Sequence, residues 1–419
     1  MFGLDIFSSK ARISASLEEV TTIGDEEEDP HALGLEPAAL ESVWHAVERY
    51  YRSGIHPAIQ VCLRYRGRIA LDRAIGHAHG NGPGDDPEEL PVLATPETPF
   101  NIFSASKAVT AMLMHLLDQE KLLHLDDHVC EFIPEFGKHG KDKITIRHLL
   151  AHRAGIPNIP AEAMELDNLS RPDEVLRILS EARPIHRPGQ NLAYHAISSG
   201  FVLAEVVQRV TGSDIRTVLE QRILKPLRFR WMRYGTKPKL VPLVARNYYT
   251  GPPQLPVVSY LLRRALSIPV QRVVELSNDP RFLTGVIPSG NVVTTAEELS
   301  RFYQLLLNGG ELDGTRIFDA RTIRRATSEQ SYFEFDSILG LPIRYSLGFM
   351  LGARWLSLYG PDTDRTFGHL GFTNIIGWAD PDRELAGAVI TSGKPLVYPE
   401  IIYAFELMRQ IGQAFPKVV

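Results

Sequence analysis

Residues 101–123 read NIFSASKAVTAMLMHLLDQEKLL and place Ser104 and Lys107 three positions apart at the start of an apolar stretch. Pro99 precedes this stretch, and apolar residues recur within it at helical spacing. We therefore predict a largely buried helix that begins near Phe103. Because residues three apart share one face of a helix, the serine hydroxyl and the lysine amine should meet at its N-terminus, where free N–H groups favour negative charge.

This spacing suits a serine nucleophile with an amine as its proton partner. A serine hydroxyl alone is a weak nucleophile, and a lysine whose charged form is disfavoured by burial can accept its proton at neutral pH. The S-x-x-K pattern by itself has low specificity, because a capping serine followed by a surface lysine gives the same letters. The hypothesis therefore needs partner motifs elsewhere in the chain.

The composition is that of an ordinary globular protein. The chain has 419 residues, of which 44% are hydrophobic and 23% charged, and this length allows two lobes. The net charge is −5 and no basic run is interleaved with aromatic residues, so nucleic-acid binding is not expected. We find neither a signal-peptide pattern nor an uninterrupted apolar run of about 18 residues, and we expect a cytoplasmic protein without a membrane span.

Strand patterns occur towards both ends of the chain, and helical patterns dominate the middle. The predicted elements are a helix over 36–53, a hairpin of strands 58–65 and 68–74, strands over 346–351, 374–380 and 385–391, and a terminal helix over 398–411. Terminal segments that both supply strands are most simply joined in one sheet. We therefore predict an α+β fold in which an antiparallel sheet is flanked by helices.

The same pattern suggests how the chain divides. We predict an N-terminal arm over residues 1–35 and an α/β domain with the antiparallel sheet, formed by residues 36–99 and 289–419. Residues 100–288 would be an inserted, mostly helical domain that carries the nucleophile. A basic amphipathic helix is predicted over residues 257–268 of this domain.

Two later motifs accompany the serine and lysine. Tyr194 follows the loop sequence PIHRPGQN (residues 184–191), and residues 369–371 read HLG beside a late strand. This order resembles the serine β-lactamase and penicillin-binding-protein superfamily, whose motifs are S-x-x-K, Y-x-N, and K-T-G or H-x-G. The resemblance covers most of the chain from about residue 36. It implies a β-lactamase-like fold with the active site between the sheet and the helical lobe.

The resemblance also implies catalytic roles. Ser104 would be the acylated nucleophile and Lys107 its proton partner. Tyr194 would act as a base helped by Lys107 and shuttle protons to the leaving group. The oxyanion hole would consist of the backbone N–H groups of Ser104 and Phe372.

Other residues would contact the substrate, according to the same resemblance. His369 and His195 are candidate substrate-binding residues, and Gly371 would let the substrate approach the strand. His148 and His152 are spaced four apart, but no acidic or cysteine ligand accompanies them as in H-E-x-x-H, so no metal is expected. No cofactor is expected either.

One departure from the superfamily pattern bears on the substrate. Tyr194 is followed by His195 and Ala196, so the asparagine of Y-x-N is missing, together with the contact that it would make to the lysine and to a β-lactam's amide side chain. The H-x-G variant and the missing export signal also favour an esterase over a β-lactamase. The chain looks most like the family VIII carboxylesterases, which resemble class C β-lactamases but act on esters.

The leading prediction is a serine carboxylesterase that acts through an acyl-enzyme on small esters with short to medium acyl chains. Residues 248–262 and Phe372 would supply an apolar wall for the substrate. A β-lactamase, a D-amino-acid peptidase or a transacylase of the same superfamily stays open as an alternative, as does a non-catalytic binding protein. The sequence does not specify the natural substrate or the oligomeric state.

Overall fold

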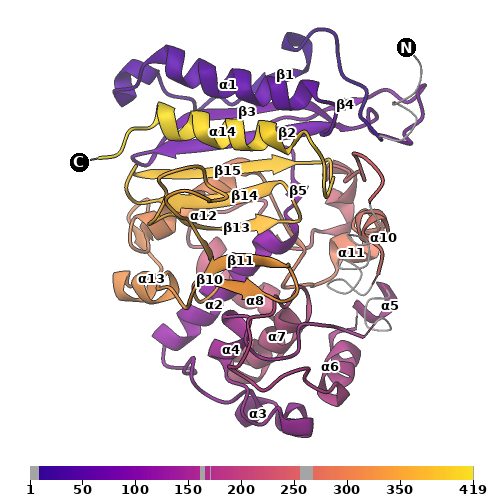
Figure 1. The fold of residues 1–419 in the computed structure, drawn as a ribbon, viewed down its shortest axis with the longest axis vertical. Coiled ribbons are helices and arrows are strands. Elements are labelled where there is room, and N and C mark those ends of the chain that lie inside the picture. Colours follow the sequence, from indigo (N-terminus) through magenta and orange to yellow (C-terminus); the bar gives the residue numbers. More distant parts are fainter. Residues whose placement is uncertain (1–8, 161–165, 170, 255–267, 419) are drawn as a thin grey trace.

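The computed structural model describes residues 9–160, 166–169, 171–254 and 268–418, and its main feature is a ten-stranded antiparallel sheet (Figure 1). The strand order is β1-β3-β2-β15-β14-β13-β12-β11-β10, and β4 pairs with β3. The strands are β1 Thr21–Ile23, β2 Ala58–Tyr65, β3 Arg68–His79, β4 Val92–Leu93, β10 Ser331–Asp336, β11 Leu341–Tyr345, β12 Met350–Leu351, β13 Phe367–Gly371, β14 Ile375–Asp380 and β15 Leu385–Thr391. The predicted α+β class is confirmed.

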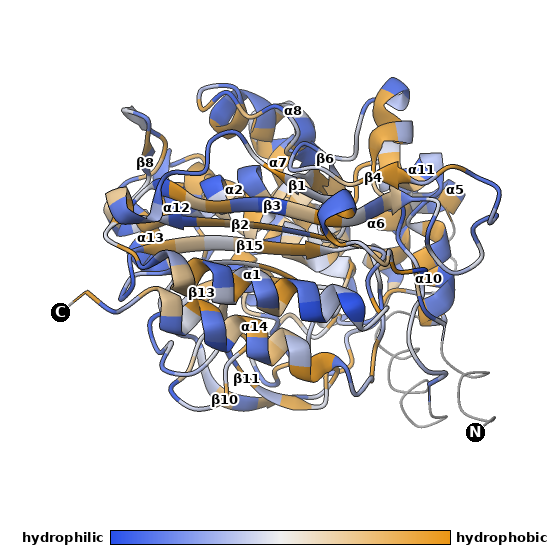
Figure 2. Ribbon diagram, turned by 90° about the horizontal axis from the view of Figure 1, so that it is seen from above, coloured by the Kyte–Doolittle hydropathy of each residue, from blue (hydrophilic) through white to orange (hydrophobic). Residues whose placement is uncertain are grey.

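Helices cover both faces of this sheet (Figure 2). Helices α1 (Pro37–Arg52) and α14 (Ile401–Ala414) pack on one face, and α12 (Ala296–Leu307) packs on the other against β2, β14 and β15. Because both faces are covered, every residue of β2 and β15 is buried. This explains why these strands read as nearly continuous apolar runs in the sequence.

The middle of the chain is mainly helical and is built around α2 (Ser106–Gln119), whose residues are buried from Ser106 to Leu117. The other helices there are α3 Val129–Phe132, η5 Pro134–Gly140, α4 Ile146–Leu150, α5 Leu166–Leu169, α6 Pro172–Glu181, α7 Ser198–Thr211, α8 Ile215–Leu219, η7 Glu220–Leu224, η8 Pro238–Leu243, α10 Val270–Leu276 and α11 Pro280–Thr284. A small sheet of β5 (Phe100–Asn101), β7 (Val292–Thr294) and β6 (Arg233–Tyr234) joins the two ends of this region. We retain residues 100–288 as a proposed domain.

The predicted N-terminal arm also contributes to the sheet. Its strand β1 pairs with β3 at the edge, and Glu27, in the acidic run 25–29, bonds Arg73 at 2.8 Å. One strand prediction is partly wrong. Of the strand predicted over 346–351, only Met350–Leu351 forms a strand, β12. The hairpin of β10 and β11 at the edge of the sheet was missed. Exposed Tyr332 and Phe335 lie on this edge hairpin, so its sequence lacks the alternation of a half-buried strand.

The predicted helix over 257–268 falls almost entirely outside the described residues. The remaining elements are η2 Glu18–Val20, η3 Pro30–Leu33, β8 Glu311–Leu312, β9 Thr315–Arg316 and α13 Ala320–Ala326. In the part of the chain that the structure describes, no helix is long and apolar enough to cross a membrane.

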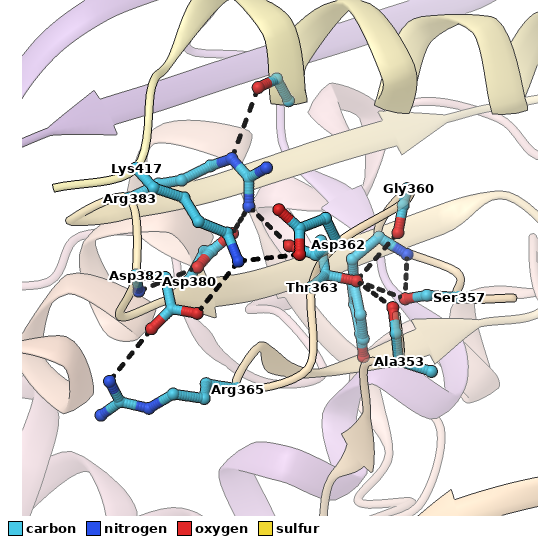
Figure 3. A network of polar contacts seen from close by, with 12 residues as sticks. Ala353, Ser357, Gly360, Asp362, Thr363, Arg365, Asp380, Asp382, Arg383 and Lys417 are labelled. Carbon is cyan, nitrogen blue, oxygen red and sulfur yellow. Dashed lines mark hydrogen bonds and ion pairs between the residues drawn. The ribbon is translucent and has the colours of Figure 1, made fainter. Parts of the chain in front are cut away.

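The loop between β12 and β13 is held by a polar network (Figure 3). The Thr363 hydroxyl donates to the carbonyl of Gly360 at 2.8 Å. The Arg383 guanidinium donates to the carbonyl of Asp362 at 3.0 Å, and the Lys417 ammonium lies 3.0 Å from the Asp362 carboxylate. These contacts fix the chain just before β13, the strand that carries the HLG motif.

Candidate active site

Ser104 lies in a short 3₁₀ turn, η4 (Phe103–Ala105), which runs directly into α2. The predicted helix start near Phe103 is confirmed. Phe103 has φ of +47°, a left-handed conformation that costs a non-glycine residue about 1–3 kcal/mol. The neighbouring Ile102 N–H donates to the carbonyl of Val292 at 2.9 Å, so strand β7 helps to hold the turn. The turn leaves the Ser104 side chain only half-buried.

The Lys107 amine has three close neighbours and lies almost wholly inside the protein. Its Nζ atom lies 2.7 Å from the carbonyl oxygen of Ala196, 3.0 Å from that of Ser289 and 3.1 Å from Ser104 Oγ. Burial lowers the pKa of Lys107 to about 7, so a large fraction of the amine is neutral near neutral pH.

The two carbonyl neighbours determine where the lone pair of the neutral amine points. A neutral amine has two N–H donors and one lone pair, and carbonyl oxygens can only accept. If the carbonyls of Ala196 and Ser289 take the two N–H groups, the lone pair is left facing the Ser104 hydroxyl. This arrangement is suited to removing the serine proton.

Tyr194 completes the group around the serine. Its ring lies beside the amine, with Lys107 Nζ 4.9 Å from the ring centroid, and its hydroxyl is hydrogen-bonded to Ser104. The Tyr194 N–H donates to the Asp336 carboxylate at 3.1 Å, which fixes this loop against β10. Burial raises the pKa of Tyr194 well above its usual value, which favours a phenol that passes a proton on over a standing phenolate base.

The end of β13 lies against the serine turn, and Figure 1 shows α2 beneath this strand. Phe372 follows β13 with φ of +54°, and its ring packs 5.1 Å from that of Phe103. A Cβ atom on Gly371 would lie 2.2 Å from the carbonyl oxygen of Ile102. Glycine is therefore required here by the approach of the chain to itself, whereas the sequence suggested an approach by substrate.

Comparison with known proteins identifies this arrangement. The Beta-lactamase family matches residues 45–404. The chain belongs to the Beta-lactamase family. It is 27% identical over 333 residues to the esterase/β-lactamase LipL of Mycobacterium tuberculosis, covering 74% of each protein.

Two solved structures of the superfamily are similar over nearly their whole length. A penicillin-binding-protein homologue from Caulobacter crescentus gives a TM-score of 0.77 at 25% identity, covering 91% of this chain and 99% of that one. A family VIII carboxylesterase gives 0.75 at 26% identity, covering 89% and 97%. The resemblance inferred from the motifs is confirmed, and the protein is a serine hydrolase of the β-lactamase and penicillin-binding-protein superfamily.

The residue at the asparagine position of the family motif needs a correction. The sequence suggested that Ala196 abolishes the contact with the lysine. The structure retains that contact, because the main-chain carbonyl of Ala196 accepts from Lys107. Sequence reasoning missed both this carbonyl and that of Ser289, since a carbonyl acceptor leaves no trace in the residue type.

The two histidines that were predicted to bind substrate are buried. His195 is fully buried, and its Nε2 accepts from the N–H of Ile156 at 3.2 Å. His369 is 1% exposed and donates from Nδ1 to the carbonyl of Leu370 at 2.8 Å. Burial lowers the pKa of each histidine to about 3, so both rings are neutral. These contacts argue against substrate binding, and we propose a supporting role for both rings.

A third histidine, His152, was missed as part of the site. Its ring lies 4.7 Å from that of Tyr194, and its carbonyl accepts from the N–H of Ala193 at 3.0 Å. The His195 N–H in turn donates to His152 Nδ1 at 3.2 Å. His152 therefore supports the loop that carries the tyrosine. Its spacing from His148 raised only the question of a metal site, which was not expected, so the sequence held no clear signal for this role.

The predicted apolar wall is only partly described by the structure. Residues 255–262 of the predicted wall lie outside the described residues, and the Tyr248 hydroxyl donates to the Asp85 carboxylate at 2.6 Å. The β10–β11 hairpin and β13 instead place partly buried apolar side chains against the cluster of Tyr194 and its neighbours, namely Leu339, Ile343 and Leu370. We propose that these side chains contribute to the apolar wall of the site, in addition to the predicted Phe372.

The lowered pKa of Lys107 predicts a pH profile. Because the neutral amine is the form that accepts a proton, kcat/KM for an ester should rise as the pH passes through about 7 and level off above it. Below that point it should fall about tenfold per pH unit. Rate measurements with a p-nitrophenyl ester over this range will test the expectation. A Tyr194→Phe variant is the control, since it should lower the plateau without moving the midpoint; a midpoint near 5 would contradict the assignment to Lys107.

Proposed function

We propose that the protein is a serine carboxylesterase that cleaves small esters with short to medium acyl chains through an acyl-enzyme on Ser104. The observation that carries this proposal is the position of the Lys107 amine, which lies 3.1 Å from Ser104 Oγ and has two carbonyl oxygens as its other close partners. The likeness to a family VIII carboxylesterase and to an esterase/β-lactamase supports the ester as substrate.

Acylation begins with transfer of the Ser104 hydroxyl proton to Lys107 Nζ while Oγ bonds to the ester carbonyl carbon. The negative charge that develops on the carbonyl oxygen would be held by the N–H groups of Ser104 and Phe372. Two such donors contribute about 3–4 kcal/mol each to lowering the barrier. Ser104 follows the left-handed residue Phe103, and Phe372 is itself left-handed. Such turns hold backbone N–H groups in a fixed direction.

The tetrahedral intermediate then collapses as the bond to the alcohol oxygen breaks. The departing alkoxide takes a proton from the Tyr194 hydroxyl, and Tyr194 regains one from the Lys107 ammonium. A water molecule repeats the sequence in reverse: it loses a proton to the same pair, attacks the acyl carbon and releases the carboxylic acid and free Ser104. No group outside these three side chains is needed to balance the protons.

Ala196 supports esters over β-lactams as substrates. The position offers a methyl side chain, so it has no amide with which to bind the acylamino group of a penicillin or cephalosporin. A site that lacks a hydrogen-bond partner for a polar substrate group discriminates against that substrate. A simple ester needs only the nucleophile, the oxyanion donors and an apolar wall such as that formed by Leu339, Ile343 and Leu370.

We therefore expect kcat/KM for p-nitrophenyl butyrate to exceed that for nitrocefin by at least about 10²-fold. Steady-state kinetics on both substrates with one enzyme preparation will measure the ratio, and an acyl-chain series from acetate to dodecanoate will define the preferred length. Comparable values for the ester and the cephalosporin would make the protein a β-lactamase in function, which is the second candidate because LipL carries both names.

A further inference from the structure

The turn between β13 and β14 combines a strained backbone with two polar side chains that point into the scaffold. Phe372 takes a left-handed φ of +54°, which a non-glycine residue keeps only where its surroundings impose it. The following Thr373 Oγ1 donates to the carbonyl of Pro395 at 2.6 Å, and Asn374 Nδ2 donates to Thr373 Oγ1 at 2.6 Å. The turn is therefore held by its side chains as well as by strand pairing.

Two buried phenols hold Asn374 from the far side of the sheet. Tyr50, on α1, donates to Asn374 Oδ1 at 3.1 Å, and Tyr398, just before α14, donates to the same oxygen. The two phenol oxygens are 2.9 Å apart. All three side chains are at most 5% exposed, so water does not compete freely for these bonds.

These hydroxyls lie in the apolar cluster between the sheet and the helices α1 and α14. Phenylalanine would fill the same space without a polar group to satisfy, so packing alone does not require two tyrosines that share one acceptor. Burial raises the pKa of both phenols, and both stay protonated donors over the working pH range. Their common target is the residue two positions after the proposed oxyanion donor.

We propose that Tyr50, Tyr398 and Asn374, here called the asparagine clamp, are positioning residues for the oxyanion hole. The clamp holds the turn so that the Phe372 N–H points at the developing oxyanion. A donor contributes fully only when it is oriented before the reaction begins, and a relaxed turn would rotate this N–H away. The inference rests on the proposed function, since it takes Phe372 as the second donor.

The test uses Tyr50→Phe, Tyr398→Phe and the double variant, which remove the hydroxyls and keep the rings. Each single variant should lower kcat for p-nitrophenyl butyrate about 3- to 10-fold and the double variant about 10- to 100-fold, with KM within about twofold. The rate constant for fluorophosphonate modification of Ser104 should fall by the same factors, because that reaction also builds negative charge on oxygen. The midpoint of the pH profile near 7 should not move, because the clamp does not touch Lys107.

Tyr359→Phe is the matched control. The Tyr359 hydroxyl is buried and donates to the carbonyl of Met350 at 3.0 Å on the same sheet, so its removal should lower the melting temperature comparably and leave both rates unchanged. The proposed role of the clamp is wrong if the variants lose stability but keep the rates of hydrolysis and of phosphonylation within about twofold of this control. It is also wrong if the variants raise KM and leave kcat unchanged. Should the double variant not fold, the two single variants decide the matter by the same criteria.

The phosphonylation rate separates this inference from the esterase proposal. If the wild-type protein is modified on Ser104 but hydrolyses no ester, the proposed substrate class is wrong, and the clamp is still judged by the modification rates of its variants. If the wild-type protein hydrolyses esters and the variants are phosphonylated at the wild-type rate, the clamp is wrong and the function stands.

Discussion

Replacing Ser104 by alanine should abolish ester hydrolysis, with an expected loss in kcat of about 10⁴-fold or more, because the proposed covalent step uses this hydroxyl as its nucleophile. The protein should stay folded, since the lost hydroxyl of a half-buried residue near a helix start costs at most about 1–2 kcal/mol. Steady-state rates with p-nitrophenyl butyrate and a thermal melt will measure both quantities. Mass spectrometry of the trapped wild-type protein should find the acyl group on Ser104.

Ser106→Ala is the matched control for this variant. Ser106 lies two residues further on, at the start of α2, and its buried hydroxyl accepts from the N–H of Val292 at 3.0 Å. Its removal leaves a buried donor without a partner and should reduce the free energy of unfolding by about 1–3 kcal/mol. Activity should nevertheless survive. An acyl adduct on any serine other than Ser104 would refute the assignment of the nucleophile.

The second large effect is expected from Lys107→Met, which should lower kcat about 10³-fold, within the range usual for loss of a general base. Methionine has a similar length but cannot accept the Ser104 proton. The carbonyls of Ala196 and Ser289 also lose their donor, so the melting temperature should fall as well. The measurement is kcat as a function of pH. The rise in rate around pH 7 that is expected for the wild-type protein should be absent from the residual activity of this variant.

Lys141→Met provides the control for the loss of stability. Lys141 is likewise buried, and its amine donates to the carbonyls of Ser180 at 2.9 Å and Ala182 at 2.6 Å. Its replacement leaves two carbonyls without a donor in the same way, but among the described residues this amine makes no hydrogen bond to a serine hydroxyl. Near-normal turnover in Lys107→Met, or an equal loss in both variants, would show that Lys107 is not the base.

The sequence predicted the elements whose signal is local. The start of α2 follows from the apolar spacing after Ser104, and β2 and β15 match their predicted ranges because strands buried on both faces are rich in apolar residues. The hairpin of β10 and β11 was missed, since an edge strand that exposes Tyr332 and Phe335 does not alternate between apolar and polar residues.

The site was predictable where side chains carry the chemistry. Ser104, Lys107 and Tyr194 were found by motif, and the structure brings them together. The parts that were missed are matters of backbone geometry. The carbonyl of Ser289 has the same chemistry as any other carbonyl, and the left-handed turn at Phe372 occurs at a residue that rarely adopts it. Such features depend on the path of the chain and not on residue type.

The main-chain partners of Lys107 have a consequence for protein engineering. A side-chain substitution at position 196 or 289 cannot delete the carbonyl oxygens that orient the amine. The side chains near the amine and the acceptors that orient it are therefore separable properties in this scaffold, although burial by those side chains still sets the pKa of Lys107. Position 196 can therefore be varied to explore new acyl groups while both carbonyl acceptors of the amine are kept.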